Sequence, residues 1–140
     1  MVLAACGLLD RGDMAGARDF TELQAWQLAD QVRIEIDRIT GTSAFRRHPK
    51  LQEQLLDAAD SACSNTAEGF SRFKPKDFAR FVRISRGSLS EILDRLISAR
   101  RRGLISEQDF QLVSSLARRA KAACTGLINY LDSADEPPRR

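Results

Sequence analysis

Two pairs of polar residues stand at helical spacing in segments that are otherwise apolar on one face. Asn65 and Glu68 are three residues apart, as are Ser88 and Glu91, so each pair shares one side of a helix. A carboxylate beside an amide or hydroxyl could serve general acid–base catalysis, but that chemistry needs titrating groups of matched pKa in a pocket. We expect instead a structural polar network in which these residues hydrogen-bond across two helices, with Arg72 as a charge partner.

Other catalytic and metal sites lack the residues that they require. His48 is the only histidine, whereas a di-metal site in a helical bundle needs Glu-x-x-His on two helices. The sequence contains no nucleophile elbow and no glycine-rich phosphate loop. The cysteines, Cys6, Cys63 and Cys124, are odd in number and far apart, which argues against a disulfide scaffold and a zinc site. We therefore expect no enzymatic activity, no metal and no cofactor.

Basic side chains are concentrated in one part of the chain. The net charge is +3, but residues 71–102 hold ten Lys or Arg against three Asp or Glu. Such a segment is either a solvated helix face or a surface that binds phosphates, with Phe73 as the one nearby aromatic residue that could stack on a base. The candidate nucleic-acid contacts are the basic stripe, which consists of Arg72, Lys76, Arg80, Arg83 and Arg86, together with Arg100 and Arg101.

Apolar residues spaced three and four apart place these side chains on helices. The pattern predicts helices over 21–40, 49–69, 75–103 and 106–131, with Thr21 and Ser106 as N-caps, and no segment shows strand-like alternation. Short connections between four helices favour an all-α, antiparallel up-down-up-down four-helix bundle. We expect this bundle over 19–133, between poorly ordered tails at 1–18 and 134–140. Translation could start at Met1 or at Met14.

The third predicted helix carries more apolar residues than one face requires. Its main seam and a second apolar row alternate along 78–99, so we expect part of the second row to lie in an oligomer interface. Gly69 should end the second helix, whereas Gly87 lies inside the third, where close helix packing would explain it. The seam consists of Phe78, Val82, Ser85, Leu89, Ile92, Leu96 and Ala99, and the second row of Phe81, Ile84, Leu93 and Ile97.

The sequence has no membrane-spanning character. No apolar run approaches the roughly 20 residues that cross a bilayer, and only five residues precede Cys6 in a segment similar to a lipoprotein cleavage box. Cys63 and Cys124 fall on apolar helical faces, as small core residues do in a reducing compartment. We expect a cytoplasmic protein that makes no membrane contact.

Four segments carry a resemblance to a known family. They are Phe-Thr-Glu-Leu-Gln-Ala-Trp-Gln (20–27), Ser-Asn-Thr-Ala-Glu-Gly-Phe-Ser-Arg (64–72), Gly-Ser-Leu-Ser-Glu (87–91) and Ser-Ala-Arg-Arg-Arg-Gly-Leu-Ile-Ser (98–106). In this order, across 19–132, the chain resembles the four-helix-bundle proteins first noticed as products of intervening sequences within bacterial 23S rRNA genes. The accessory variability determinants of diversity-generating retroelements resemble the same group.

The resemblance implies a homopentamer and, from the retroelement members, a basic surface that binds nucleic acid and a reverse transcriptase. The second helix departs from the family pattern, because Leu56 and Asp57 stand where relatives carry a basic pair. We expect a non-enzymatic homo-oligomer that acts as a nucleic-acid-binding or ribonucleoprotein accessory module, on RNA or DNA, through the basic stripe. The alternative is an oligomeric protein scaffold that binds no nucleic acid and uses an apolar groove between the first and third helices.

Overall fold

The computed structural model describes residues 17–134, and all regular structure within that range is helical, which confirms the predicted all-α class. The elements are the 3-10 turn η1 (Phe20–Glu22) and the helices α3 (Gln24–Thr40), α4 (Ser43–Arg46), α5 (Pro49–Phe70), α6 (Pro75–Arg101) and α7 (Glu107–Ala134). None of the described helices has the length and apolar character that a bilayer crossing requires. The predicted tails lie largely at 1–16 and 135–140, outside the described residues.

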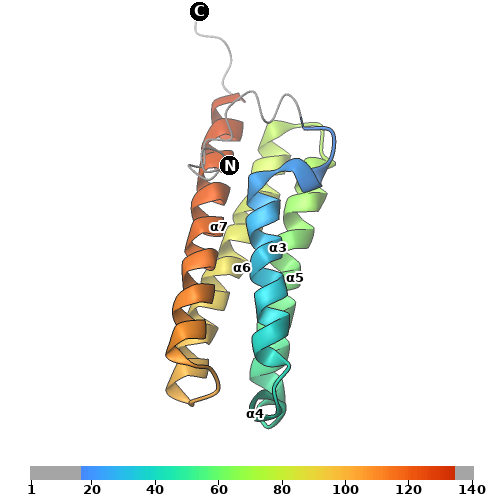
Figure 1. Cartoon of the computed structure of the whole chain (residues 1–140). Helices are drawn as coiled ribbons and strands as arrows, with labels where there is room; N and C mark the ends of the chain where they lie inside the picture. The colour runs from blue at the N-terminus through green and yellow to red at the C-terminus, as the bar shows by residue number, and fades with distance from the viewer. Residues whose placement is uncertain (1–16, 135–140) are drawn as a thin grey trace, which may run out of the picture.

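The four long helices lie side by side, and each runs in the opposite direction to the one before it (Figure 1). Helix α5 packs between α3 and α6, and α7 packs against the same two helices from the other side. Helices α3 and α6 therefore occupy diagonal positions. The predicted apolar groove between the first and third helices is wrong, because α5 and α7 separate these two helices.

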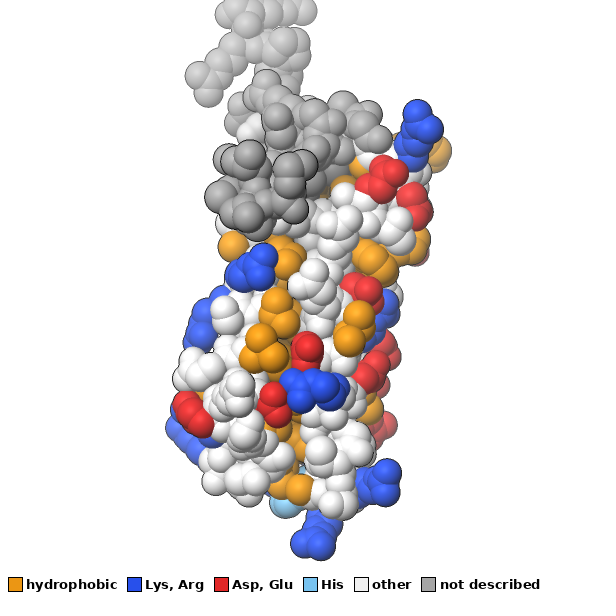
Figure 2. Space-filling view, viewed as in Figure 1, with side chains coloured by type: hydrophobic (Ala, Val, Ile, Leu, Met, Phe, Trp, Pro, Cys, Tyr) orange, Lys and Arg blue, Asp and Glu red, His pale blue; other side chains and the backbone are white. Residues whose placement is uncertain are grey.

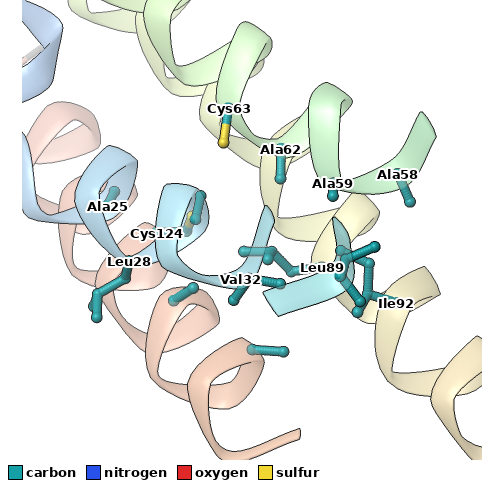
Figure 3. Packing of buried hydrophobic residues seen from close by; sticks show 14 of the residues in the cluster. Ala25, Leu28, Val32, Ala58, Ala59, Ala62, Cys63, Leu89, Ile92 and Cys124 are labelled. Atoms are coloured by element: carbon teal, nitrogen blue, oxygen red, sulfur yellow. The ribbon is translucent and has the colours of Figure 1, made fainter. Parts of the chain in front are cut away.

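Small residues on α5 allow its neighbours to approach closely. Figure 3 shows Ala58, Ala59, Ala62 and Cys63 on α5 beside larger side chains such as Leu89 of α6. All four small residues and Leu89 are at most 4% exposed. Burial of a large aliphatic side chain contributes about 1.5–3 kcal/mol, so the packing of Leu89 against the small residues of α5 stabilises the fold.

The main seam of the third predicted helix is buried along its whole length, as predicted. The second apolar row is mostly covered within the chain as well. Leu93 and Ile97 pack against the core, Phe81 is half-buried, and only Ile84 of this row is exposed. The large apolar side chains exposed in the described part are Ile34, Phe73, Ile84 and Leu112, each on a different helix or turn. The row thus serves mainly the packing of this chain.

The close helix packing predicted for Gly87 is found at Gly69. Gly69 lies inside the last turn of α5, and a Cβ there would stand 2.8 Å from Cδ1 of Phe78 and 3.0 Å from Cβ of Phe81. A Cβ at Gly87 would meet no atom within 4 Å, so the predicted close packing at Gly87 is wrong and occurs at Gly69 instead. The left-handed conformation that favours glycine is found at Gly103, where φ is 70° just after α6.

The starts of α5, α6 and α7 match the sequence prediction, whereas the start of α3 does not. Pro49 and Pro75 begin α5 and α6, where the missing N–H has no helical partner to lose. Ser106 caps α7 as predicted, because its Oγ accepts the N–H of Asp109 at 3.0 Å. The predicted cap at Thr21 is wrong. Thr21 lies in η1 and its hydroxyl donates to Asp19, so α3 begins only at Gln24.

Candidate nucleic-acid interface

The polar residues of α5 and α6 meet through a serine that sequence reasoning missed. Oγ of Ser61 lies 2.8 Å from Oγ of Ser88 and accepts the amide of Asn65 at 3.0 Å. Asn65 and Ser88 therefore meet through Ser61 and not by a direct hydrogen bond across the two helices. Nearby, the buried hydroxyls of Thr66 and Ser85 hydrogen-bond at 2.9 Å. Small hydroxyls satisfied in this way fix the relative register of α5 and α6.

The two glutamates of the predicted network form ion pairs with arginines four residues further along the chain. Glu68 accepts from Arg72 at 2.6 Å, as expected for its charge partner, and Glu91 lies 4.0 Å from Arg95. Both carboxylates are exposed. Exposed pairs of this kind contribute little stability, about 0–1 kcal/mol. Because both glutamates are exposed, neither of them lies in an enclosed site.

The basic stripe begins with two arginines that share one aromatic ring. The guanidinium carbons of Arg72, in the α5–α6 turn, and Arg80, on α6, lie 4.9 Å and 5.0 Å from the ring centroid of Phe81. A cation over an aromatic face gains about 0.5–1 kcal/mol at an exposed site. The ring therefore positions both charges at the surface, close to exposed Lys76.

The remaining two arginines of the stripe reach toward α7. Arg83 forms an ion pair with Asp132 at 2.5 Å, and Arg86 donates to the hydroxyl of Thr125 at 3.3 Å. Within the stripe, Arg72 and Arg80 thus contact Phe81, whereas Arg83 and Arg86 contact α7. The stripe spans the first half of α6 and the turn before it.

Arg100 and Arg101 lie far from the stripe. Twenty residues separate Arg80 from Arg100 in the same helix, which corresponds to about 30 Å at 1.5 Å per residue. Arg100 stacks 3.8 Å above the ring of Phe110 and approaches Glu107 at 3.5 Å, so it joins the end of α6 to the start of α7. The structure therefore does not bring these two arginines together with the stripe.

The charge at the stripe remains positive after its carboxylates are counted. The structure adds Lys74, an exposed residue of the α5–α6 turn that the helical spacing did not include. Six cations then face three carboxylates, which leaves a net charge of three positive. The cations are Arg72, Lys74, Lys76, Arg80, Arg83 and Arg86, and the carboxylates are Glu68, Asp77 and Asp132.

The face formed by α3 and α7 has a different character. Positive and negative side chains are interspersed there, with apolar side chains between the helices (Figure 2). Arg38 bridges Glu35 at 2.6 Å and Asp109 at 2.8 Å. Hydrogen bonds to these carboxylates raise the pKa of Arg38, and the bond from Arg38 lowers the pKa of Asp109. The charge of Arg38 on this face is thus balanced by two carboxylates.

Cys63 and Cys124, the cysteines within residues 17–134, are free and buried. Burial raises the pKa of Cys63 and of Cys124 to about 12, so both thiols stay protonated at neutral pH. No group of three or more histidine, cysteine or acidic side chains in that range is placed to hold a metal ion.

Two hollows flank the α5–α6 turn, beside the start of the stripe. One, of about 520 Å³, is lined by two cations, Arg72 and Lys74, and by two carboxylates, Glu68 and Asp77, together with Ser71 and Phe73. The other, of about 250 Å³, is lined mainly by apolar side chains, among them Phe70, Phe78 and Tyr130. This end of the molecule therefore offers cations and aromatic surface together.

A search of curated proteins finds no match. A family model described as 23S rRNA-intervening sequence protein matches residues 21–126, which include all of α3, α5 and α6 and most of α7. The match covers well over half of the chain, so this chain belongs to the 23S rRNA-intervening sequence protein family.

Proposed function

We propose that this chain is a non-enzymatic accessory module, an antiparallel up-down-up-down four-helix bundle that binds nucleic acid through the basic stripe and Lys74. The observation that carries the proposal is the gathering of six cations against three carboxylates at the α5–α6 turn and the first half of α6. The family's connection with rRNA insertions supports an RNA-related role. The free, buried thiols of Cys63 and Cys124 suit a reducing, cytoplasmic compartment.

The binding mechanism is electrostatic. Cations that neutralise phosphates release condensed counterions, so the affinity falls as salt rises, with a slope of about 0.7–0.9 per phosphate contact. Arg72 and Arg80 present guanidinium groups that are already held by Phe81, which reduces the side-chain entropy lost on binding. Binding of this kind recognises charge and shape and reads little base sequence.

We also propose that the module is a homo-oligomer, a pentamer by resemblance to its family. Several copies in a ring would repeat the stripe, so that weak phosphate contacts on each copy combine into stronger binding on a long strand. Sedimentation velocity gives the subunit number directly. A single monomeric species at all concentrations tested would remove this part of the proposal.

The proposal is tested by charge reversal. The variant Lys76→Glu with Arg80→Glu reverses two exposed cations that form no ion pair with another described residue. The matched control is Arg118→Glu with Arg119→Glu, which makes the same charge change on exposed positions of α7. Labelled RNA and DNA oligonucleotides are titrated between about 50 and 200 mM salt, where phosphate-driven binding changes steeply.

We expect the α6 variant to lose most of its affinity and salt dependence and the α7 control to lose much less. Absence of binding by the wild-type chain at low salt, or equal losses in both variants, would refute the proposal. The second candidate, a scaffold that binds a polypeptide, would then be favoured, because the hollow beside Phe70 and Tyr130 is lined mainly by apolar side chains. We also propose a reverse transcriptase as a protein partner. Its co-purification is compared between the wild type and the α6 variant.

A further inference from the structure

Phe73 is the most exposed large apolar residue in the described part of the chain. Of the seven phenylalanines, six are buried or half-buried, whereas Phe73 is 103% exposed, as in an extended chain. A phenylalanine left in water forgoes the roughly 1.5–3 kcal/mol that burial would contribute. A single exposed apolar side chain is common on protein surfaces. Phe73 differs from the other exposed apolar residues in that Arg72 and Lys74 stand on either side of it in the sequence.

The turn that carries Phe73 is held on both sides. Before it, the N–H of Ser71 and the N–H of Arg72 donate to the carbonyls of Glu68 and Gly69 at 3.1 and 3.0 Å. After it, Pro75 begins α6 with its fixed φ, and the carbonyl of Lys74 accepts the first helical bond of that helix. A backbone fixed in this way presents the Phe73 ring without a large ordering cost on binding.

The ring of Phe73 stands between the two hollows of the α5–α6 turn. Phe73 and Arg72 line both of them. The apolar hollow of about 250 Å³ lies on the side of Phe70 and Tyr130, and the polar hollow of about 520 Å³ lies on the side of Lys74. The smaller volume lies just below the range of about 300–1,000 Å³ that holds drug-sized molecules, so it suits one flat ring.

We propose that this turn binds single-stranded nucleic acid, with one unpaired base stacked on Phe73 over the apolar hollow and the adjacent phosphate held by Arg72 and Lys74. This inference rests on the proposed function and narrows its ligand to single strands or unpaired loops. Bases in a duplex are already stacked and cannot reach the ring, whereas an unpaired base offers its π-face. Cations beside the ring favour a phosphate-bearing ligand over an apolar peptide. Every base has a π-face, so the contact adds affinity without sequence preference.

The test separates stacking from charge. Phe73→Ala removes the ring, Phe73→Leu keeps an apolar side chain, and Phe73→Trp keeps an aromatic one. Affinities are measured for a single-stranded oligonucleotide and for a duplex with the same number of phosphates. Because Phe73 makes no buried contact, the variants should fold, and their thermal unfolding is recorded to show it.

We expect Phe73→Ala and Phe73→Leu to weaken single-strand binding roughly tenfold or more, as the loss of one base–aromatic stack does, with duplex binding and the salt slope unchanged. Phe73→Trp should keep the wild-type affinity, and its fluorescence should be quenched by the single strand and not by the duplex. Unchanged single-strand affinity in Phe73→Ala, or equal losses for both ligands, would overturn the inference and leave the proposed function standing. Absence of binding to either ligand by the wild type would instead remove both.

Discussion

The hydroxyls of Thr66 on α5 and Ser85 on α6 hydrogen-bond to each other at 2.9 Å, and both residues are fully buried. Each hydroxyl also approaches a carbonyl of its own helix, Thr66 that of Ala62 at 3.1 Å and Ser85 that of Phe81 at 3.4 Å. The pair is thus a satisfied polar contact within an otherwise apolar interface between helices. Removal of one partner leaves the other with fewer bonds in a place that water does not reach.

Thr66→Val should therefore destabilise the protein by about 1–3 kcal/mol, although it keeps the side-chain shape. Ser85→Ala should cost less in the Thr66→Val background than in the wild type, because the bond is already lost. Urea unfolding of the two single variants and the double variant gives the coupling free energy. Ser64→Ala, at an exposed position of the same helix, is the control. Strict additivity of the two changes would show that the hydroxyls do not act as a pair.

Two glycine substitutions should act in opposite directions. Gly69→Ala forces a methyl group to within 2.8 Å of the buried Phe78 ring, so helix α5 or α6 must shift, at a cost of about 1–3 kcal/mol. Gly87→Ala meets no atom within 4 Å in the interior of α6 and should stabilise the protein by about 0.5–1 kcal/mol. The measurement is the thermal unfolding midpoint of each variant. Equal shifts of the two midpoints would contradict the close approach at Gly69.

The ion pair between Arg38 and Asp109 should make the stability depend on pH. The bond from Arg38 lowers the pKa of Asp109 in the folded protein, so its contribution is present above the unfolded-state pKa and is lost as the pH falls through the lowered folded-state pKa. Asp109→Asn should thus be less stable than the wild type at neutral pH and equal to it in strong acid. Urea unfolding across this range measures the difference, with Asp37→Asn, an exposed carboxylate on α3, as control. A difference between wild type and Asp109→Asn that stays constant with pH would rule out this linkage.

The core thiols should be unreactive until the protein unfolds. With a pKa of about 12, Cys63 and Cys124 hold a thiolate fraction on the order of a thousandfold below that of an exposed thiol. In a Cys6→Ser variant, iodoacetamide at mildly alkaline pH should label native protein slowly and urea-unfolded protein quickly. Mass spectrometry counts the labels. Rapid labelling of the native variant would show that α5 and α7 open far more readily than their packing implies.

The periodic features of the fold were accessible from the sequence, because burial on a helix repeats with the helical turn. The α6 seam from Phe78 to Ala99 is buried throughout, and Ser106 caps α7 as its type and position predicted. Glycine carries no such signal. Whether Gly69 or Gly87 meets a neighbouring helix depends on which side of α6 faces α5, and that is a property of the assembled helices.

The candidate site was predictable only in part for the same reason. Spacing placed the basic stripe on one side of α6, but it could not show that Asp132, some fifty residues later, would pair with Arg83. Ser61 escaped notice because a lone serine in a helix is common, and its role depends on Ser88 across the interface. Lys74 escaped because turn residues follow no helical period.

The ring of Phe81 supports two guanidinium groups at once, those of Arg72 and Arg80. The directions in which these positive charges project are consequently set by an uncharged side chain. A substitution at position 81 can reshape the electric field at this end of the molecule while the formal charge of the protein stays the same.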